Sequence, residues 1–247
     1  MIKKLFFLVA LSIPFISCQF TETLQLNEDG SGRMAIVMDM SEMMALGGDM
    51  MKDSVATKLD TIISMKTFLE EKKDSISQLS EEKQMQLKKL ENYHIRTLMD
   101  TEKGEMIFNM YTDFKSIDEA NDIFNGLGQT KSLMPSMGDH DAMNKEDEDE
   151  KEIIGVSYSY ENKKFIRDAF IKDVEKHKQE VDSLKKTESF MSAMRYKLKY
   201  TFPSKIIKSS IENATYSLDG KTIEVEAVFT DYFKNPDILD LEIELEK

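Results

Sequence analysis

The C-terminal stretch from residue 196 to 246 alternates apolar and polar side chains so regularly that it restricts the fold more than any other part of the chain. A period of two places every second side chain on the same face of a β-strand. Three runs show it, with the apolar members Tyr196, Leu198, Tyr200 and Phe202; Ile223, Val225, Ala227 and Phe229; and Leu239, Leu241, Ile243 and Leu245. The polar positions carry lysines in the first run and mostly acidic residues in the other two. This pattern predicts antiparallel strands with one apolar and one solvated face, on which lysines and glutamates of neighbouring strands offset each other.

Turn signals divide the rest of the chain into hairpins. Asp219-Gly220 is a typical two-residue hairpin turn, and "NEDGSG" at residues 27–32 separates two apolar runs near the N-terminus. Another turn is expected at Glu102 to Gly104, between the runs "YHIRTLMD" and "EMIFNMYTDF". A fourth hairpin is expected where the alternating run from 154 to 160 returns at Phe165. The chain therefore contains strands along most of its length.

Helical spacing appears between the hairpins. From residue 54 to 76 the apolar residues recur at intervals typical of a helix, at Val55, Leu59, Ile62, Leu69 and Ile76. A second helix is expected to begin near Ser80, and the capping box "SIDE" at 116–119 should open a short one. A charged helix is expected from 172 to 190, with a thin apolar stripe at Val174, Val181 and Leu184. The predicted class is α+β, an antiparallel sheet built from hairpins with amphipathic helices packed on one face.

This architecture leads to an expectation about the apolar face of the sheet. Its large inward positions are Phe108, Tyr158, Tyr196, Tyr200, Phe202 and Phe229, whereas the 172–190 helix offers only a narrow stripe to cover them. A gap there would form a cavity or groove suited to an acyl chain or a similar ligand. The alternative is that the 54–76 helix fills the space.

The N-terminus has the pattern of a cleaved export signal. Lys3 and Lys4 precede an apolar run that is too short to span a bilayer, and "FISC" then ends at Cys18, the single cysteine of the chain. "FISC" resembles a bacterial lipobox, although Phe15 stands where leucine is more usual. We therefore interpret residues 1–17 as a lipoprotein signal peptide and Cys18 as the site that carries acyl chains such as palmitate. The alternative is a secreted protein that keeps an unpaired cysteine, which would be unusual in an oxidising compartment.

The rest of the chain indicates one extracytoplasmic domain over 18–247, with an acidic, flexible loop at 128–152. Without Lys3 and Lys4, 31 basic residues remain against 46 acidic ones, a net charge of −15. Such a surface is repelled by phosphate backbones, which argues against nucleic-acid binding.

Two segments resemble the LppM-like lipoproteins, a family with many uncharacterised members from Bacteroidetes. They are "LQLNEDGSGRMAIVMDMS" and "YTFPSKIIKSSIENATYSLDGKTIEVEAVFTDYFKNPDILDLEIEL", which together make up roughly a third of the mature chain. The shared features are the glycine-containing hairpin just after the cysteine, Phe202-Pro203, the "DGKT" turn and Asn235-Pro236. The resemblance implies an envelope lipoprotein without catalytic residues, whose α+β domain can enclose an apolar groove.

Motifs of catalysis are missing from the sequence. It contains no "GxxxxGK[ST]", "HExxH" or "GxSxG", and the three histidines, His94, His140 and His177, lie far apart. We therefore expect no enzyme and no cofactor, with a catalytic set assembled only by the fold as the alternative.

One stretch has a composition that suits a soft metal. In "MPSMGDHDAM", Met134, Met137, His140 and Met143 recur at every third residue, and we call these four residues the Met/His run. Thioether and imidazole groups are ligands for copper. A chance run is the competing interpretation, because the chain contains 18 methionines. The acidic run 146–150 lacks the glycine and ligand spacing of a Ca²⁺ loop and is expected to be solvated.

Two functions follow from these features. The first is a membrane-anchored envelope lipoprotein with a non-enzymatic binding or structural role, with a lipid or another apolar molecule as its possible ligand. The outer membrane is its expected location, and its face, periplasmic or surface, is left open. The alternative is a copper-handling lipoprotein that uses the Met/His run.

Overall fold

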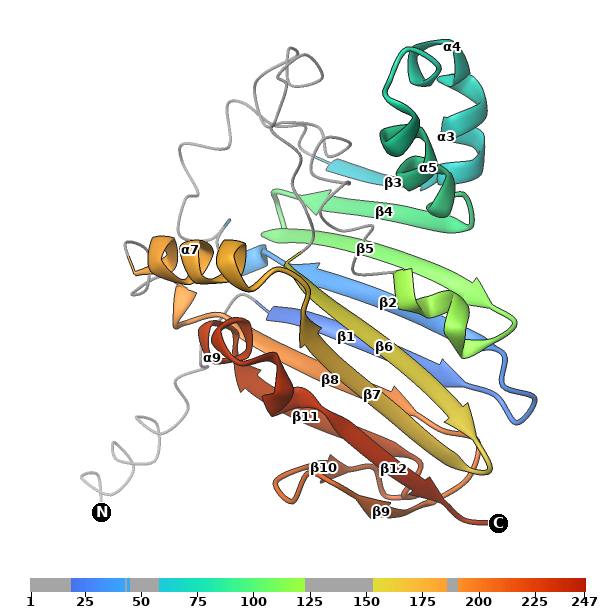
Figure 1. The fold of residues 1–247 in the computed structure, drawn as a ribbon, viewed down its shortest axis with the longest axis vertical. Coiled ribbons are helices and arrows are strands. Elements are labelled where there is room, and N and C mark those ends of the chain that lie inside the picture. The colour runs from blue at the N-terminus through green and yellow to red at the C-terminus, as the bar shows by residue number, and fades with distance from the viewer. Residues whose placement is uncertain (1–18, 43, 45–57, 123–152, 186–190) are drawn as a thin grey trace.

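The computed structural model describes residues 19–42, 44, 58–122, 153–185 and 191–247, and within these ranges the strands form two sheets (Figure 1). The expected loop at 128–152 lies outside the described residues. The predicted α+β class is confirmed, with strands that are antiparallel in all pairs described but one.

The larger sheet has eight strands in the order β10-β11-β8-β1-β2-β5-β4-β3. β1 pairs with β2 in an antiparallel hairpin on one side and with β8 in parallel on the other. The strands are β1 (Gln19–Leu26), β2 (Gly32–Asp39), β3 (Lys58–Ser64), β4 (Tyr93–Asp100), β5 (Glu105–Phe114), β8 (Arg195–Thr201), β10 (Thr215–Tyr216) and β11 (Thr222–Val228).

The smaller sheet has four strands in the order β6-β7-β12-β9 and lies across one face of the larger sheet (Figure 1). Its strands are β6 (Ile154–Glu161), β7 (Lys164–Ile171), β9 (Ile206–Ser209) and β12 (Leu241–Leu245). All three of its pairings are antiparallel.

The predicted hairpins are confirmed, although residues 217–221 join β10 to β11 where a two-residue turn at Asp219-Gly220 was expected. The chemistry of the turns explains the hairpins. In the β1–β2 turn, Gly30 has a φ of +84°, which L side chains rarely adopt, and Asn27 N–H donates to the Ser31 carbonyl at 2.8 Å. Gly104 and Gly220 occupy the same left-handed region in the β4–β5 and β10–β11 turns. The expected charge pairs on the wet face also form, with Lys199 Nζ 2.9 Å from Glu224 Oε1 on the neighbouring strand.

The helix predicted from 54 to 76 is wrong for 58–64, which form edge strand β3. A helix begins only at Met65, whose side chain is buried. β3 is antiparallel to β4, and Arg96 of β4 makes a bidentate ion pair with Asp60. The β-branched residues Thr61, Ile62 and Ile63 favour a strand over a helix at this position. The helices that follow β3 are α3 (Met65–Glu71), α4 (Lys73–Ile76) and α5 (Glu81–Lys89).

The other helical predictions are confirmed in part. The Ser80 hydroxyl accepts from Lys83 N–H and caps α5 as expected. The capping-box segment forms a 3-10 helix, η1 (Ile117–Asp122), in which Glu119 accepts from Lys115 N–H. The charged helix is α7 (Val174–Leu184), and residues 186–190 lie outside the described part. Its expected apolar stripe is wrong at Val174, which is 70% exposed.

The main core lies between the two sheets. Tyr200, Phe165 and Leu241 are among its fully buried members, and they come from β8, β7 and β12. Two further elements close its side, α9 (Phe229–Lys234) and the 3-10 helix η3 (Pro236–Leu239). The elements that cover the aromatic face of the larger sheet are thus mainly strands, where helices were expected. Within the described residues, no helix is both long and apolar enough to cross a membrane.

A smaller second cluster lies near the turn that joins β4 to β5. It consists of Met44, Met99, Met106 and Phe108, with Met38, Met40 and Leu59 packed against it. Methionine is flexible and polarizable, which suits it to irregular packing of this kind. Met44, from a methionine pair in the sequence, is therefore a core residue.

Candidate functional site

A charged pair lies between the two sheets. Glu22 occupies an inward position of β1, two residues before the buried Leu24, and Arg167 occupies an inward position of β7, two residues after the buried Phe165. Both side chains are 0% exposed. Fully buried charges are tolerated only when they are paired and hydrogen-bonded. The contacts of this pair therefore decide whether it is structural or chemically reactive.

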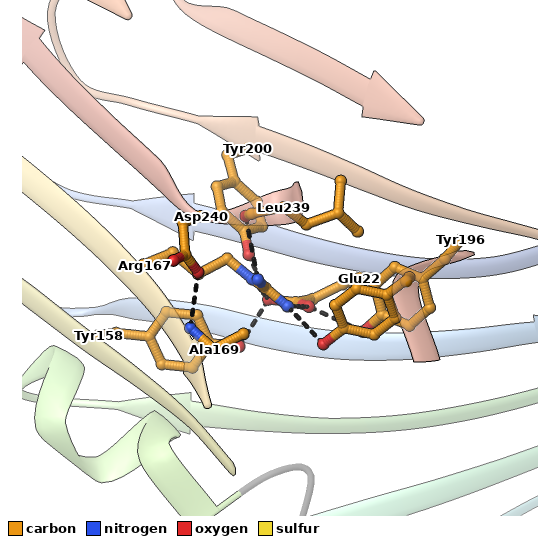
Figure 2. Close-up of polar contacts among 9 residues, drawn as sticks. Glu22, Tyr158, Arg167, Ala169, Tyr196, Tyr200, Leu239 and Asp240 are labelled. Carbon is orange, nitrogen blue, oxygen red and sulfur yellow. Dashed lines mark hydrogen bonds and ion pairs between the residues drawn. The ribbon is translucent and has the colours of Figure 1, made fainter. Parts of the chain in front are cut away.

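The Glu22 carboxylate accepts five hydrogen bonds (Figure 2). Arg167 donates two of them, from Nε to Oε1 at 3.3 Å and from Nη2 to Oε2 at 3.1 Å. The hydroxyl of Tyr158 donates to Oε1 at 2.5 Å and that of Tyr196 to Oε2 at 2.8 Å, while Tyr200 also donates to Oε1. We call Glu22, Arg167 and the tyrosines that contact them the Glu–Arg–Tyr cluster.

Arg167 also donates two hydrogen bonds to groups other than Glu22. Its Nη1 donates to the Leu239 carbonyl at 3.0 Å, and Nη2 donates to the Tyr232 hydroxyl at 3.1 Å. These partners belong to η3 and α9, so a single guanidinium connects β1, β7 and the segment before β12. Nearby, Asp240 accepts from Ala169 N–H at 2.8 Å and fastens the same segment to β7 (Figure 2).

The electrostatics keep the cluster in one protonation state. Burial alone would raise the pKa of Glu22, but the Arg167 charge and the hydrogen bonds from Arg167, Tyr158 and Tyr200 outweigh burial and lower it. Burial first, and the Glu22 charge second, raise the pKa values of Tyr158, Tyr196 and Tyr200 well above the ordinary value. At neutral pH the carboxylate is therefore ionised and the three phenols stay protonated.

This arrangement is suited to holding the two sheets together. Every contact of the carboxylate described above comes from the protein itself, and Glu22, Arg167 and Tyr200 are each 0% exposed. A general acid or base must reach a proton of its substrate within hydrogen-bond distance, and these buried atoms have their partners already. We therefore assign the cluster a structural role.

Comparison with known proteins adds little. The chain matches no protein-family model and no curated protein. Among solved structures it is similar to the folded domain of LppM from Mycobacterium tuberculosis, determined by NMR, with 7% identity and a TM-score of 0.39 over 93% of this chain and 89% of that one. This is a weak similarity of fold, and it does not show a family.

The site residues predicted from the sequence lie outside the described residues. This holds for Cys18 and for the Met/His run, so both assignments stay predictions. Within the described ranges, no group of three or more His, Cys, Asp or Glu side chains is arranged to hold a metal ion. His177 of α7 is buried with Nε2 2.7 Å from the Phe233 carbonyl, and His94 of β4 stacks on Tyr111. The structure thus places these two histidines in separate packing roles.

The aromatic positions where a groove was expected are packed. Tyr196, Tyr200 and Phe202 are at most 3% exposed beneath the smaller sheet, and Tyr158 belongs to that sheet and faces them. Phe108 lies in the methionine-rich cluster, and Phe229 begins α9 and stacks on Phe20 at 5.1 Å between ring centroids. The groove expected at these side chains is therefore not formed there, because a second sheet covers the face.

Glu22 and Arg167 were not singled out by sequence analysis, yet each leaves a signal in it. In "QFTETLQL" the inward positions include Phe20, Glu22 and Leu24, and in "KFIRDAFI" they include Phe165 and Arg167. Each strand thus has one charge on its apolar face, and the two charges are opposite in sign. Such a combination indicates a buried ion pair between strands that are distant in sequence.

Proposed function

We propose that this protein is an envelope lipoprotein, anchored through acyl chains on Cys18, with a non-enzymatic role in binding or in envelope structure. The proposal combines the lipobox-like N-terminus with the position of the first strand. A protein held by two or three acyl groups is attached to its membrane far more stably than a protein held by one acyl group.

The observation that carries the proposal is the absence of a linker between the cysteine and the sheet. β1 begins at Gln19, the residue after Cys18, and Gln19 is already in register with Asp39 of β2 and Arg195 of β8. β1 is an interior strand of the larger sheet, paired on both sides. Anchoring at Cys18 would therefore hold the folded domain directly against the membrane surface.

The Glu–Arg–Tyr cluster supports the non-enzymatic part of the proposal. It fixes β1 to the smaller sheet four residues after the cysteine, so a force applied at the anchor would be transmitted to the core. An apolar ligand remains part of the proposal. The packed aromatics beneath the smaller sheet do not supply its site, because they are already buried by protein.

Replacing Cys18 tests the anchor. The variant Cys18→Ala should lose acylation and signal cleavage, so its intact mass should include residues 1–17 and no acyl chain. Ser17→Ala is the matched control, because it keeps a small residue before the cysteine and should be processed like the wild type. Intact mass spectrometry of the wild-type protein should show a chain that starts at Cys18 with acyl chains added. A free, titratable thiol at Cys18 would refute the proposal.

An apolar ligand is tested on the same preparation. Native mass spectrometry of the purified protein should show a co-purified lipid that organic extraction releases. A protein that carries no extractable apolar molecule from its own membranes would reduce the proposal to a structural role.

A further inference from the structure

The β10–β11 turn forms an exposed apolar surface at one corner of the molecule. Leu218 in the turn is 110% exposed, Tyr216 just before it is 44% exposed, and Ile207 of β9 is 65% exposed. β9 lies beside the turn, since Ile206 N–H donates to the Gly220 carbonyl at 2.9 Å. We call Ile207, Tyr216, Leu218 and the adjacent Lys205 and Lys221 the tip surface. Exposed apolar side chains on neighbouring segments are candidates for contact with another surface.

The charges around the tip surface differ in sign from those of the chain as a whole. Lys221 Nζ donates to the Pro203 carbonyl at 2.7 Å, and Lys163 Nζ lies 3.4 Å from Ser204 Oγ, so both lysines gather next to Lys205. Two acidic residues, Asp219 and Glu246, lie beside these three lysines, in a chain with 46 acidic residues. Lysines flanking exposed aliphatic and tyrosine side chains form a surface complementary to anionic lipid headgroups.

The turn also makes hydrogen bonds of its own, which lower the cost of moving it out of bulk water. Gly220 N–H donates to the Ser217 carbonyl at 2.9 Å, and Ser217 N–H donates to the Thr222 carbonyl at 3.0 Å. The Asp219 carboxylate is held within the turn, where it accepts from the Ser217 hydroxyl at 2.5 Å and from Lys221 N–H at 3.1 Å. Unsatisfied polar groups are what oppose entry into a lipid interface. Several polar groups of this turn are thus satisfied within it, and Leu218 is fully exposed.

The tip surface lies at the end of the sheet opposite Cys18. Thr201 at the end of β8 pairs with Gln25 near the end of β1 and with Thr222 at the start of β11. The turn is therefore separated from Gln19 by nearly the whole length of β1, about 20 Å at the usual rise per residue. An anchor at Cys18 would direct the turn away from the anchoring membrane.

We propose that the tip surface contacts an anionic lipid membrane that faces the membrane holding the anchor, with Leu218 inserting among the headgroups. A protruding aliphatic side chain on a convex turn, flanked by tyrosine and lysine, suits a lipid interface, in which such side chains lie at headgroup depth. The orientation of the protein in this inference rests on the proposed anchor at Cys18. The contact with the second membrane rests on the tip surface.

Vesicle bridging tests it. The full, acylated chain is reconstituted into phosphatidylcholine vesicles, and loading is checked by flotation before any second membrane is added. Fluorescent acceptor vesicles that contain phosphatidylglycerol are then mixed in, and the acceptors captured with the first vesicles are counted. Wild-type protein should capture them, and added salt should weaken the capture.

Two substitutions and one control separate the tip surface from general stickiness. Leu218→Glu should lower capture about tenfold or more, given what burial of a leucine side chain contributes. Lys205→Ala should lower it about fivefold, as expected for one lysine at an anionic surface. Met85→Glu makes the same change at another exposed apolar residue, on α5, and should have no effect. Unchanged thermal unfolding of the three variants confirms that they fold.

Each contrary result is distinct. Three results would overturn the proposed membrane contact of the tip surface. One is that the wild-type protein captures no acceptor vesicles, and another is that it captures acceptors made only of phosphatidylcholine equally well. The third is an equal loss of capture in Leu218→Glu and Met85→Glu. A chain that fails to load into the first vesicles refutes the anchor instead. In that case, sedimentation of the unanchored protein with anionic vesicles tests the tip surface directly, and equal binding by wild type and Leu218→Glu would overturn it.

Discussion

Replacing Arg167 with methionine would leave the Glu22 carboxylate buried without a counter-charge. Removing one partner of a fully buried ion pair typically costs about 3–5 kcal/mol. Two opposing effects place this case near the middle of that range. The three tyrosine hydroxyls would still donate to the carboxylate, while the Leu239 carbonyl would lose the donor it now has. We expect Arg167→Met to lower the free energy of unfolding by about 4 kcal/mol, a large part of the 5–15 kcal/mol typical of a folded domain.

Guanidinium unfolding followed by far-UV circular dichroism measures this change, because the chain has no tryptophan to report on it by fluorescence. The matched control is Lys199→Met, which removes a lysine from an ion pair on the solvated face, where its side chain is 51% exposed. Exposed pairs of this kind contribute about 0–1 kcal/mol. The double variant Glu22→Gln/Arg167→Met should be less destabilised than the sum of its single variants, because it removes both charges.

The outcome for Arg167→Met depends on the burial of the pair. A loss within about 1 kcal/mol of the Lys199→Met control would mean that water or another group compensates the Glu22 charge. Strict additivity in the double variant would mean that Glu22 and Arg167 do not interact. Either result would refute the assignment of the Glu–Arg–Tyr cluster as a buried, charge-paired connection between the sheets.

Three further predictions follow from the described residues and from the sequence. Stability should fall as the pH rises above about 10, because the three cluster tyrosines whose pKa values are raised well above normal hold their protons in the folded state only. Three such protons give a slope of about 4 kcal/mol per pH unit, measurable by denaturant unfolding at successive pH values; a flat profile would contradict it. Gly32→Ala should cost about 3 kcal/mol, since its Cβ would lie 2.2 Å from the Gln25 carbonyl oxygen and 2.6 Å from the Phe114 ring. Gly104→Ala, with a φ of +68° but open space around it, should cost only about 1 kcal/mol, and equal losses would exclude the clash. If the Met/His run binds copper, a Cu(I) competition titration should show a site that its alanine variant lacks, and identical titrations would refute it.

Strands were predictable from the sequence wherever burial imposes a period of two on one face. β8, β11 and β12 are covered by protein on one side and wet on the other, so their inward residues could be named in advance. β3 is different, because it is an edge strand with Ile62 57% exposed. Burial does not enforce an alternating pattern there, and the sparse apolar residues happened to match a helical spacing as well.

The smaller sheet could not be predicted from the sequence for another reason. Its strands come from three separate parts of the chain, and hairpin turns indicate only which neighbouring strands pair. The pairing of β12 with β7 and β9 depends on contacts between distant segments. The same limit applies to the Glu–Arg–Tyr cluster. A glutamate and an arginine on apolar strand faces indicate a buried pair, but the tyrosines that complete it come from β6, β8 and α9.

The Glu–Arg–Tyr cluster also constrains the order in which the strands of this chain can assemble. Glu22 and Tyr196 are hydrogen-bonded although they are 174 positions apart, and Arg167 is separated from Glu22 by 145. β1 can pair with β2 as soon as both are present, but the buried charge of Glu22 has no counter-charge until Arg167 of β7 is present, and its tyrosine donors come from β6 and β8. Contacts between such distant segments make folding slow, because the chain must close a long loop before they form. A chain of this topology stays incompletely folded until most of it is available. That property suits a protein that we propose to be exported through a membrane in an unfolded state before its first strand becomes fixed beside the anchor.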